Sequence, residues 1–160
     1  MLTHTNLLIH SDFKSFGSSA VLTSATCLKV IGAPELERDM KLWFIEPEYR
    51  INAIPAKIYC NIRMIAPLRA ALKNIKTRGL QDEIKTFDGC FNIRKKKAGS
   101  SPSLHSWGLA IDINAAWNGY NKPVTMSKEL LDCFRDTGLF DLGADWTIKD
   151  GMHIQLKGLT

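Results

Sequence analysis

The chain carries one stretch with apolar side chains at the three- and four-residue spacing of an amphipathic helix. These side chains are Ile65, Leu68, Leu72 and Ile75. Gly79 follows and suits the left-handed position just beyond a helix end. The start allows two interpretations. Either Pro67 is the first helical residue, or Asn61 caps an earlier turn and the helix bends at the proline.

A second helix is predicted from Ser127, a favourable N-cap residue, to Gly138. Its apolar positions are Leu130, Leu131 and Phe134. Short apolar runs elsewhere favour strands at 27–31, where the run stops at Gly32, and at 57–59. Between 43 and 60, two prolines indicate irregular or extended structure.

Alternation of apolar and polar residues predicts further strands at 83–88, 109–113 and 152–156. In the last two, aliphatic side chains occupy one face, while Asp112 and His153 point to the other. These two strands can therefore be neighbours in one antiparallel sheet. The whole pattern predicts an α+β fold, in which a small antiparallel sheet packs with two main helices.

The two polar side chains on this predicted sheet, together with His105, suggest a metal site. Two imidazoles and one carboxylate are donors that zinc accepts, and three protein ligands leave the fourth position open for water. Asp150, three residues before His153, is close enough in sequence to act as the base for that water. Each pair alone is a weak signal, because a capped turn and a hydrogen-bonded core histidine are the commoner explanations of such pairs.

The joint pattern is more specific, because it resembles a family. The motif Ser103-x-His105-x-x-Gly108-x-Ala110-x-Asp112, followed by Asp150-x-x-His153, is similar to that of zinc peptidases. They include D-Ala-D-Ala carboxypeptidases, vancomycin-resistance dipeptidases and phage L-alanyl-D-glutamate endolysins. The resemblance extends from about 54 to 156 and includes residues 57–61 and 88–94, whereas residues 1–50 match only loosely. We therefore expect a single peptidase domain over 1–160, with its catalytic core at 54–156.

The resemblance implies a role for each matching side chain. His105, Asp112 and His153 would bind Zn²⁺, and Asp150 would act as general base. Arg94 would approach the scissile carbonyl or a substrate carboxylate, a role that suits a permanently charged guanidinium. Ser103 would either bind substrate or hold the loop of His105, and both readings stay open.

The residue at position 150 also bears on the bond that is cut. Many relatives that cleave D-Ala-D-Ala have glutamate there, whereas aspartate is more similar to the phage endolysins, which cut between L-Ala and D-Glu of peptidoglycan. The resemblance therefore implies a phage-type endolysin, with a D-Ala-D-Ala carboxypeptidase as the alternative. The partner would be peptidoglycan, with no nucleic acid and no stable membrane anchor, and the protein is expected to be a monomer.

Net charge, cysteine spacing and the N-terminal sequence indicate the kind of partner and the compartment in which the protein is made. The formal net charge is +5, which favours anionic partners such as wall polymers. The four cysteines form no close pair, so we expect reduced, mostly buried thiols. The first ten residues have no basic or long apolar region typical of a secretory signal. We therefore expect a protein made in the host cytoplasm that reaches the wall after membrane permeabilisation of the holin type.

Two non-enzymatic functions stay open at this point. The basic run 94–97 and the net charge are compatible with nucleic-acid binding, although no binding motif is visible and no aromatic residues interrupt the run. The second alternative is a wall-binding protein that has lost catalysis. Several further residues have a structural interpretation beside a functional one. Trp107 and Trp146 either line a cleft or pack in the core. Asp145 is not expected to be the base, because it lies outside the Asp-x-x-His spacing. His4 and His10 are expected to be exposed and are not assigned to the metal.

Overall fold

The computed structural model describes residues 21–159, and within them the fold is α+β, as predicted. The helices are α1 (Ser24–Val30), α2 (Ile62–Thr77) and α3 (Lys128–Arg135). The strands are β1 (Met40–Phe44), β2 (Lys57–Asn61), β3 (Phe87–Gly89), β4 (Ala110–Ile113), β5 (Phe140–Leu142) and β6 (His153–Leu156). Short 3₁₀ turns connect several of these elements.

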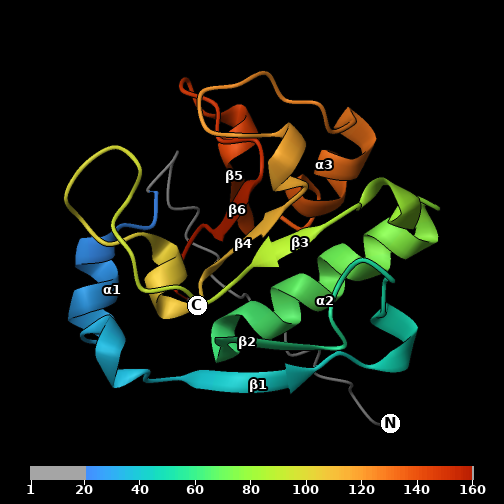
Figure 1. Ribbon diagram of the computed structural model, residues 1–160. Coiled ribbons are helices and arrows are strands. Elements are labelled where there is room, and N and C mark those ends of the chain that lie inside the picture. Colours follow the sequence, from blue (N-terminus) through green and yellow to red (C-terminus); the bar gives the residue numbers. More distant parts are fainter. Residues whose placement is uncertain (1–20, 160) are drawn as a thin grey trace, which may run out of the picture.

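The strands form two antiparallel sheets (Figure 1). β1 and β2 make a two-stranded sheet, and the other four strands make a sheet in the order β3-β4-β6-β5. Helix α2 packs against β1, β2 and α3, and α3 packs against β5. In the view of Figure 1, α2 lies between the two sheets. One continuous apolar core therefore supports the four-stranded sheet from the side of the helices.

Helix α2 starts at the earlier of the two predicted positions. The side chain of Asn61 accepts a hydrogen bond from the N–H of Arg63, which caps the first turn. Pro67 lies inside the helix, and Gly79 follows the C-cap with φ +70°. The Asn61 reading is therefore confirmed. The predicted N-cap of α3 is also confirmed, since Ser127 Oγ accepts from the N–H of Leu130.

The strand expected at 27–31 is wrong, because residues 27–30 belong to α1 and Ile31 is its C-cap. Thr23 caps this helix by accepting from the N–H of Thr26. Cys27 and Ile31, four residues apart, are buried, while Leu28 between them is exposed. The buried face thus has the helical spacing, which is hidden in a run where nearly every residue is apolar.

The strand expected at 83–88 is shorter and later than predicted. Only its end, together with Gly89, forms β3, because a 3₁₀ turn occupies Gln81–Glu83. The side chain of Asn114 accepts from the N–H groups of Lys85 and Thr86, at 2.8 and 3.1 Å. A distant side chain thus takes up backbone donors that a strand ladder would use. The strand at 57–59 is confirmed as part of β2, and the strands β1 and β5 were not predicted.

The four cysteines are free and buried, as predicted. Burial raises the pKa of the Cys60 thiol to about 12, so this side chain stays protonated at neutral pH. Among residues 21–159, no helix is both long enough and apolar enough to cross a bilayer. His4 and His10 lie outside the described residues.

Candidate metal centre

The strand register brings Asp112 and His153 together. The two residues are direct partners across the antiparallel pair β4 and β6. Ile111 pairs with Ile154 beside them, and both isoleucines are buried in the core. Since side chains alternate along a strand, Asp112 and His153 share the opposite face of the sheet. The prediction that the two polar side chains meet is confirmed.

His105 reaches the same place from a 3₁₀ turn (Leu104–Trp107) that precedes β4. Ser103 caps this turn, and its Oγ accepts from the N–H of His105 at 3.4 Å. Gly108 ends the turn with φ +64°, and a Cβ at this position would lie 2.8 Å from the backbone nitrogen of Asn61. Only glycine allows both this backbone conformation and this close approach. The motif glycine thus directs the chain from His105 into β4.

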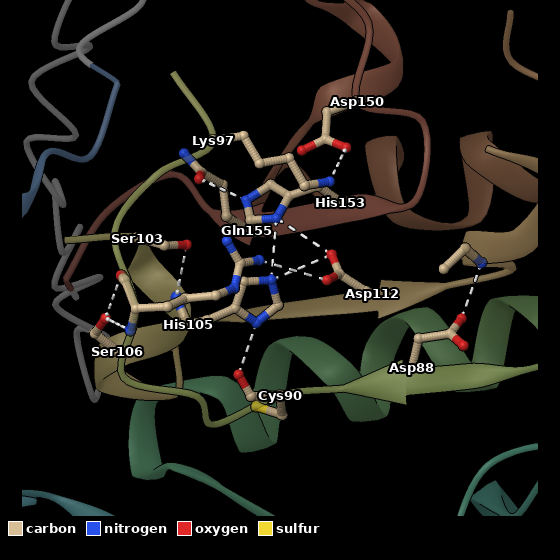
Figure 2. Close-up of polar contacts among 12 residues, drawn as sticks. Asp88, Cys90, Lys97, Ser103, His105, Ser106, Asp112, Asp150, His153 and Gln155 are labelled. Carbon is tan, nitrogen blue, oxygen red and sulfur yellow. Dashed lines mark hydrogen bonds and ion pairs between the residues drawn. The ribbon is translucent and has the colours of Figure 1, made fainter. Parts of the chain in front are cut away.

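The three side chains converge on one point (Figure 2). His105 Nε2 lies 3.2 Å from Asp112 Oδ1 and 3.2 Å from His153 Nδ1, and His153 Nδ1 lies 3.3 Å from Asp112 Oδ1. A tetrahedral zinc site with ligand distances of about 2.0 Å has edges of about 3.3 Å between its donor atoms. The donor atoms therefore already have the mutual spacing of three corners of such a site.

Hydrogen bonds on the far side of each imidazole fix which nitrogen faces this point. His105 Nδ1 donates to the carbonyl oxygen of Cys90 at 2.7 Å. His153 Nε2 donates to Gln155 Oε1 at 2.9 Å, because Gln155 Nε2 donates in turn to Asp141 at 3.2 Å. The facing nitrogens are thus unprotonated when both rings are neutral.

The third donor atom has no other partner. Asp112 Oδ1 is buried, and within residues 21–159 it accepts no hydrogen bond of suitable geometry. Burial alone would raise the pKa of Asp112, but interactions with the protonated forms of His105 and His153 outweigh burial and hold it below its ordinary value. An anion and two nitrogen lone pairs at this spacing repel one another unless a cation lies among them. The cluster fits a divalent metal, and zinc suits its donor set.

Gln155→Leu is expected to weaken zinc binding about 10- to 100-fold. Leucine cannot accept a hydrogen bond from His153 Nε2–H, so the imidazole is no longer held in the tautomer that leaves Nδ1 unprotonated. Competition titration against a chromogenic chelator measures the affinity. Gln81→Leu, at an exposed glutamine in the turn before β3, is the control and should leave the affinity unchanged. Equal affinities in both variants would show that the Gln155 contact does not orient the ligand.

A cleft of about 420 Å³ opens beside the cluster. It is lined by Arg94, Ser103, Asp150 and His153, with Trp146 at its side. A guanidinium nitrogen of Arg94 lies 3.8 Å from Asp112 Oδ2, so Arg94 faces the cluster from the cleft. Of the predicted site residues, each is thus either in the donor cluster or on the wall of this cleft.

The Asp-x-x-His spacing has a structural cause. The backbone carbonyl of Asp150 accepts from the N–H of His153 at 2.9 Å, so a tight turn joins the carboxylate to the strand of the metal cluster. The N–H of Asp150 donates to the carbonyl oxygen of Gly143 at 3.0 Å. These two hydrogen bonds fix the backbone of Asp150 just before the start of β6. Only 8% of the residue is exposed.

Gly143→Ala is expected to lower both stability and activity. A Cβ on Gly143 would overlap the backbone carbonyl oxygen of Asp150, so the turn that carries this carboxylate must move. Overpacking of this kind costs about 1–3 kcal/mol of unfolding free energy. Denaturant unfolding checks the stability. Gly158→Ala is the comparison, because a Cβ there meets no atom within 4 Å and its φ is not in the left-handed region. If Gly143→Ala retains full stability, the turn is not closely packed.

The structure decides between core packing and a place in the cleft for the residues that the sequence left open. Trp107 is buried, and its Nε1 donates to the carbonyl of Gly32 at 2.8 Å, so it packs in the core. Trp146 lines the cleft, and its ring lies 5.4 Å from that of His153. Asp145 pairs with Arg135 at 2.7 Å, outside the residues that line the cleft. The contact of Gln155 with His153 was not predicted from the sequence, although its position two residues after His153 places it on the same strand face.

The arrangement fits a metallohydrolase, because three side chains that could hold a metal ion adjoin a carboxylate and a guanidinium in an open cleft. Residues 96–156, a segment shorter than half the chain, match a family described as D-alanyl-D-alanine carboxypeptidase. The matched segment contains the His105, Asp112 and His153 cluster and Asp150, and Arg94 lies just before it. Within this segment the chain is similar to that family, which supports a zinc metallopeptidase that acts on peptidoglycan. Searches of curated proteins and of solved structures gave no significant match.

Proposed function

We propose that this enzyme hydrolyses the L-Ala-D-Glu bond in the peptide stem of peptidoglycan, with Zn²⁺ held by His105, Asp112 and His153. The observation that carries the catalytic part is the convergence of three donor atoms, each within 3.3 Å of the other two, beside a cleft that contains Asp150. The choice of bond is supported by aspartate at position 150, which resembles the phage endolysins. The family description favours D-Ala-D-Ala carboxypeptidase as the second candidate.

The chain's own groups account for the proton transfers of peptide hydrolysis. When bound, zinc supplies a Lewis acid that makes water more acidic and polarises a peptide carbonyl. Asp150 accepts a proton from the attacking water and, once protonated, gives it to the leaving amine. One carboxylate thus serves both steps, and each hydrolysed bond yields one carboxylic acid and one amine.

Arg94 has a separate role in this proposal. Its guanidinium faces the cleft, so it can donate hydrogen bonds to the oxygen of the scissile carbonyl as negative charge develops there. Ser103 holds the turn of His105 through the hydrogen bond to its backbone, and its position in the cleft wall leaves room for contact with substrate as well.

Mass spectrometry of purified peptidoglycan after incubation with the zinc-loaded protein tests the bond. Release of peptides with a free amino group on D-Glu, leaving L-Ala on the glycan with a free carboxyl group, is the expected result. Release of single D-Ala instead would assign the carboxypeptidase activity. No hydrolysis by a zinc-containing protein would contradict both candidates and leave wall binding as the function.

The same proposal extends to biological context. We propose a phage-type lysis enzyme that acts after membrane permeabilisation, and a wall peptidase carried on the virion is a close variant. The net charge of +5 supports attraction to anionic wall polymers at low salt. Added protein should clear a suspension of permeabilised cells faster than one of intact cells, and equal rates would contradict the need for membrane damage.

A further inference from the structure

The basic run 94–97 is part of the cleft, although a run of this kind is commonly only a solvated surface. Three of its four cations, Arg94, Lys96 and Lys97, line the cleft, whereas Lys95 does not. The backbone fixes this arrangement, since Lys95 pairs with Pro102 across the loop and the N–H of Lys96 donates to the carbonyl of Ser101 at 2.9 Å. The loop therefore presents positive charge to the site on a folded support.

The charges on the cleft wall do not balance. Asp150 is the single acidic side chain among the described residues that line the cleft, facing three cations. Arg94 lies near Asp112, and Lys97 Nζ lies 3.3 Å from Asp150 Oδ1 (Figure 2). Within residues 21–159, no carboxylate lies within ion-pair distance of Lys96. An approaching anion would thus meet an unmatched positive charge in a partly enclosed space, where charge interactions are stronger than in bulk water.

Lys97 is held in position beside the unmatched charge. Its ammonium lies over the ring of Tyr120, 5.6 Å from the centroid, while it also contacts Asp150. An ammonium carries three N–H donors, so one lysine can contact Asp150 and a second carboxylate together. About two thirds of the Lys97 side chain is already buried (35% exposed), which reduces the entropy lost on binding.

We propose that Lys96 and Lys97 form a subsite for a carboxylate of the substrate, so that the enzyme selects peptides with a free carboxylate on the residue after the scissile bond. This inference rests on the proposed function. A γ-linked D-Glu carries a free α-carboxylate next to the L-Ala-D-Glu bond, and a terminal D-Ala carries one next to the D-Ala-D-Ala bond. Amidation of that carboxylate removes its charge and should weaken recognition.

A pair of synthetic stem peptides that differ only in this group tests the subsite. One carries D-Glu after L-Ala, and the other carries its α-amide, D-isoglutamine. A second pair, with a free or amidated terminal D-Ala, covers the other bond. We expect the unmodified enzyme to prefer the acid of the cleaved pair by about 10- to 100-fold in kcat/KM, as for charge-assisted hydrogen bonds.

Single charge removals assign the preference to residues. Lys96→Gln should lower the preference for acid over amide about tenfold, mainly through slower turnover of the acid. Lys97→Gln also removes a contact with Asp150, so its overall rate is not a clean readout. The ratio of kcat/KM for the acid to kcat/KM for the amide is again measured, and it should also fall. Lys95→Gln is the matched control, since it removes the same charge from the same loop outside the cleft and should preserve the ratio.

The possible outcomes separate this subsite from the proposed function. Equal hydrolysis of acid and amide by the unmodified enzyme overturns the subsite while the peptidase function stands. If no peptide is hydrolysed, the proposed function fails, and calorimetric binding of D-Glu-γ-L-Lys and of its α-amide, D-isoglutaminyl-L-Lys, decides the subsite independently. Tighter binding of the acid that is lost in Lys96→Gln supports the subsite, and equal binding overturns it.

Discussion

Asp150→Asn is expected to lower kcat by about 10²- to 10⁴-fold, the usual contribution of general acid-base catalysis, while zinc content stays unchanged. Asparagine has nearly the same size as aspartate but cannot accept a proton from water. The backbone hydrogen bonds of residue 150 to Gly143 and His153 persist, so the turn keeps its position. Asp150 is also not one of the three clustered donor residues. The variant should therefore separate catalysis from metal binding.

Asp145→Asn is a matched control for this experiment. It makes the same chemical change five residues away, at a carboxylate that pairs with Arg135 outside the cleft. Its kcat should equal that of the unmodified enzyme, with at most a small loss of stability from the exposed ion pair. Initial rates on a stem peptide and metal analysis of the same samples measure both effects. Full activity of Asp150→Asn would contradict the assignment of this residue as the base.

Removal of the metal is expected to abolish activity and also to lower the melting temperature by about 10 °C. Without a cation, the buried anion of Asp112 lies among two nitrogen lone pairs at 3.2 and 3.3 Å, or the imidazoles must take up protons. A ligand that binds only the folded state at about 1,000 times its Kd adds about 4 kcal/mol to the stability. For a domain of this size, each kcal/mol shifts the melting temperature by about 2–4 °C.

Calorimetric scans of zinc-loaded, chelated and reconstituted protein measure this shift. Readdition of zinc should restore both the melting temperature and turnover. Asp112→Asn should melt at nearly the same temperature with and without zinc, because it loses the anionic ligand. An unmodified protein whose activity and melting temperature are insensitive to chelation would contradict the metal site.

Signals that are local in sequence predicted much of the fold. The caps of α2 and α3 depend on single side chains close to the helix start, Asn61 and Ser127, so the sequence contains the necessary information. The strands β4 and β6 could be predicted because aliphatic side chains alternate with polar ones along the sequence, so that one face of each strand is aliphatic. The errors arise where the decisive contact is distant. Asn114 takes the backbone donors of 85 and 86 from 28 or more residues away, and β5 has only three residues.

The candidate site divides in the same way. Alternation along two strands placed Asp112 and His153 on one face, and the register then made them direct partners. His105 had no such periodic signal, because it lies in a 3₁₀ turn, and its place in the site was predicted from its donor chemistry and from the family motif. Lys97 was recognised only as part of a basic run, since its contact with Asp150 spans 53 residues. Contacts of this length depend on the folded topology and leave no local pattern.

The position of β6 in its sheet gives the metal cluster a further meaning for folding. β6 follows β5 along the chain, yet it lies between β4 and β5, and β5 has no other partner in that sheet. Synthesis order and assembly order therefore differ, because β5 stays unpaired until β6 inserts. A chain truncated before His153 would leave a gap at the centre of the sheet rather than a frayed edge. Zinc bound by Asp112 and His153 would thus require that β6 has already paired with β4.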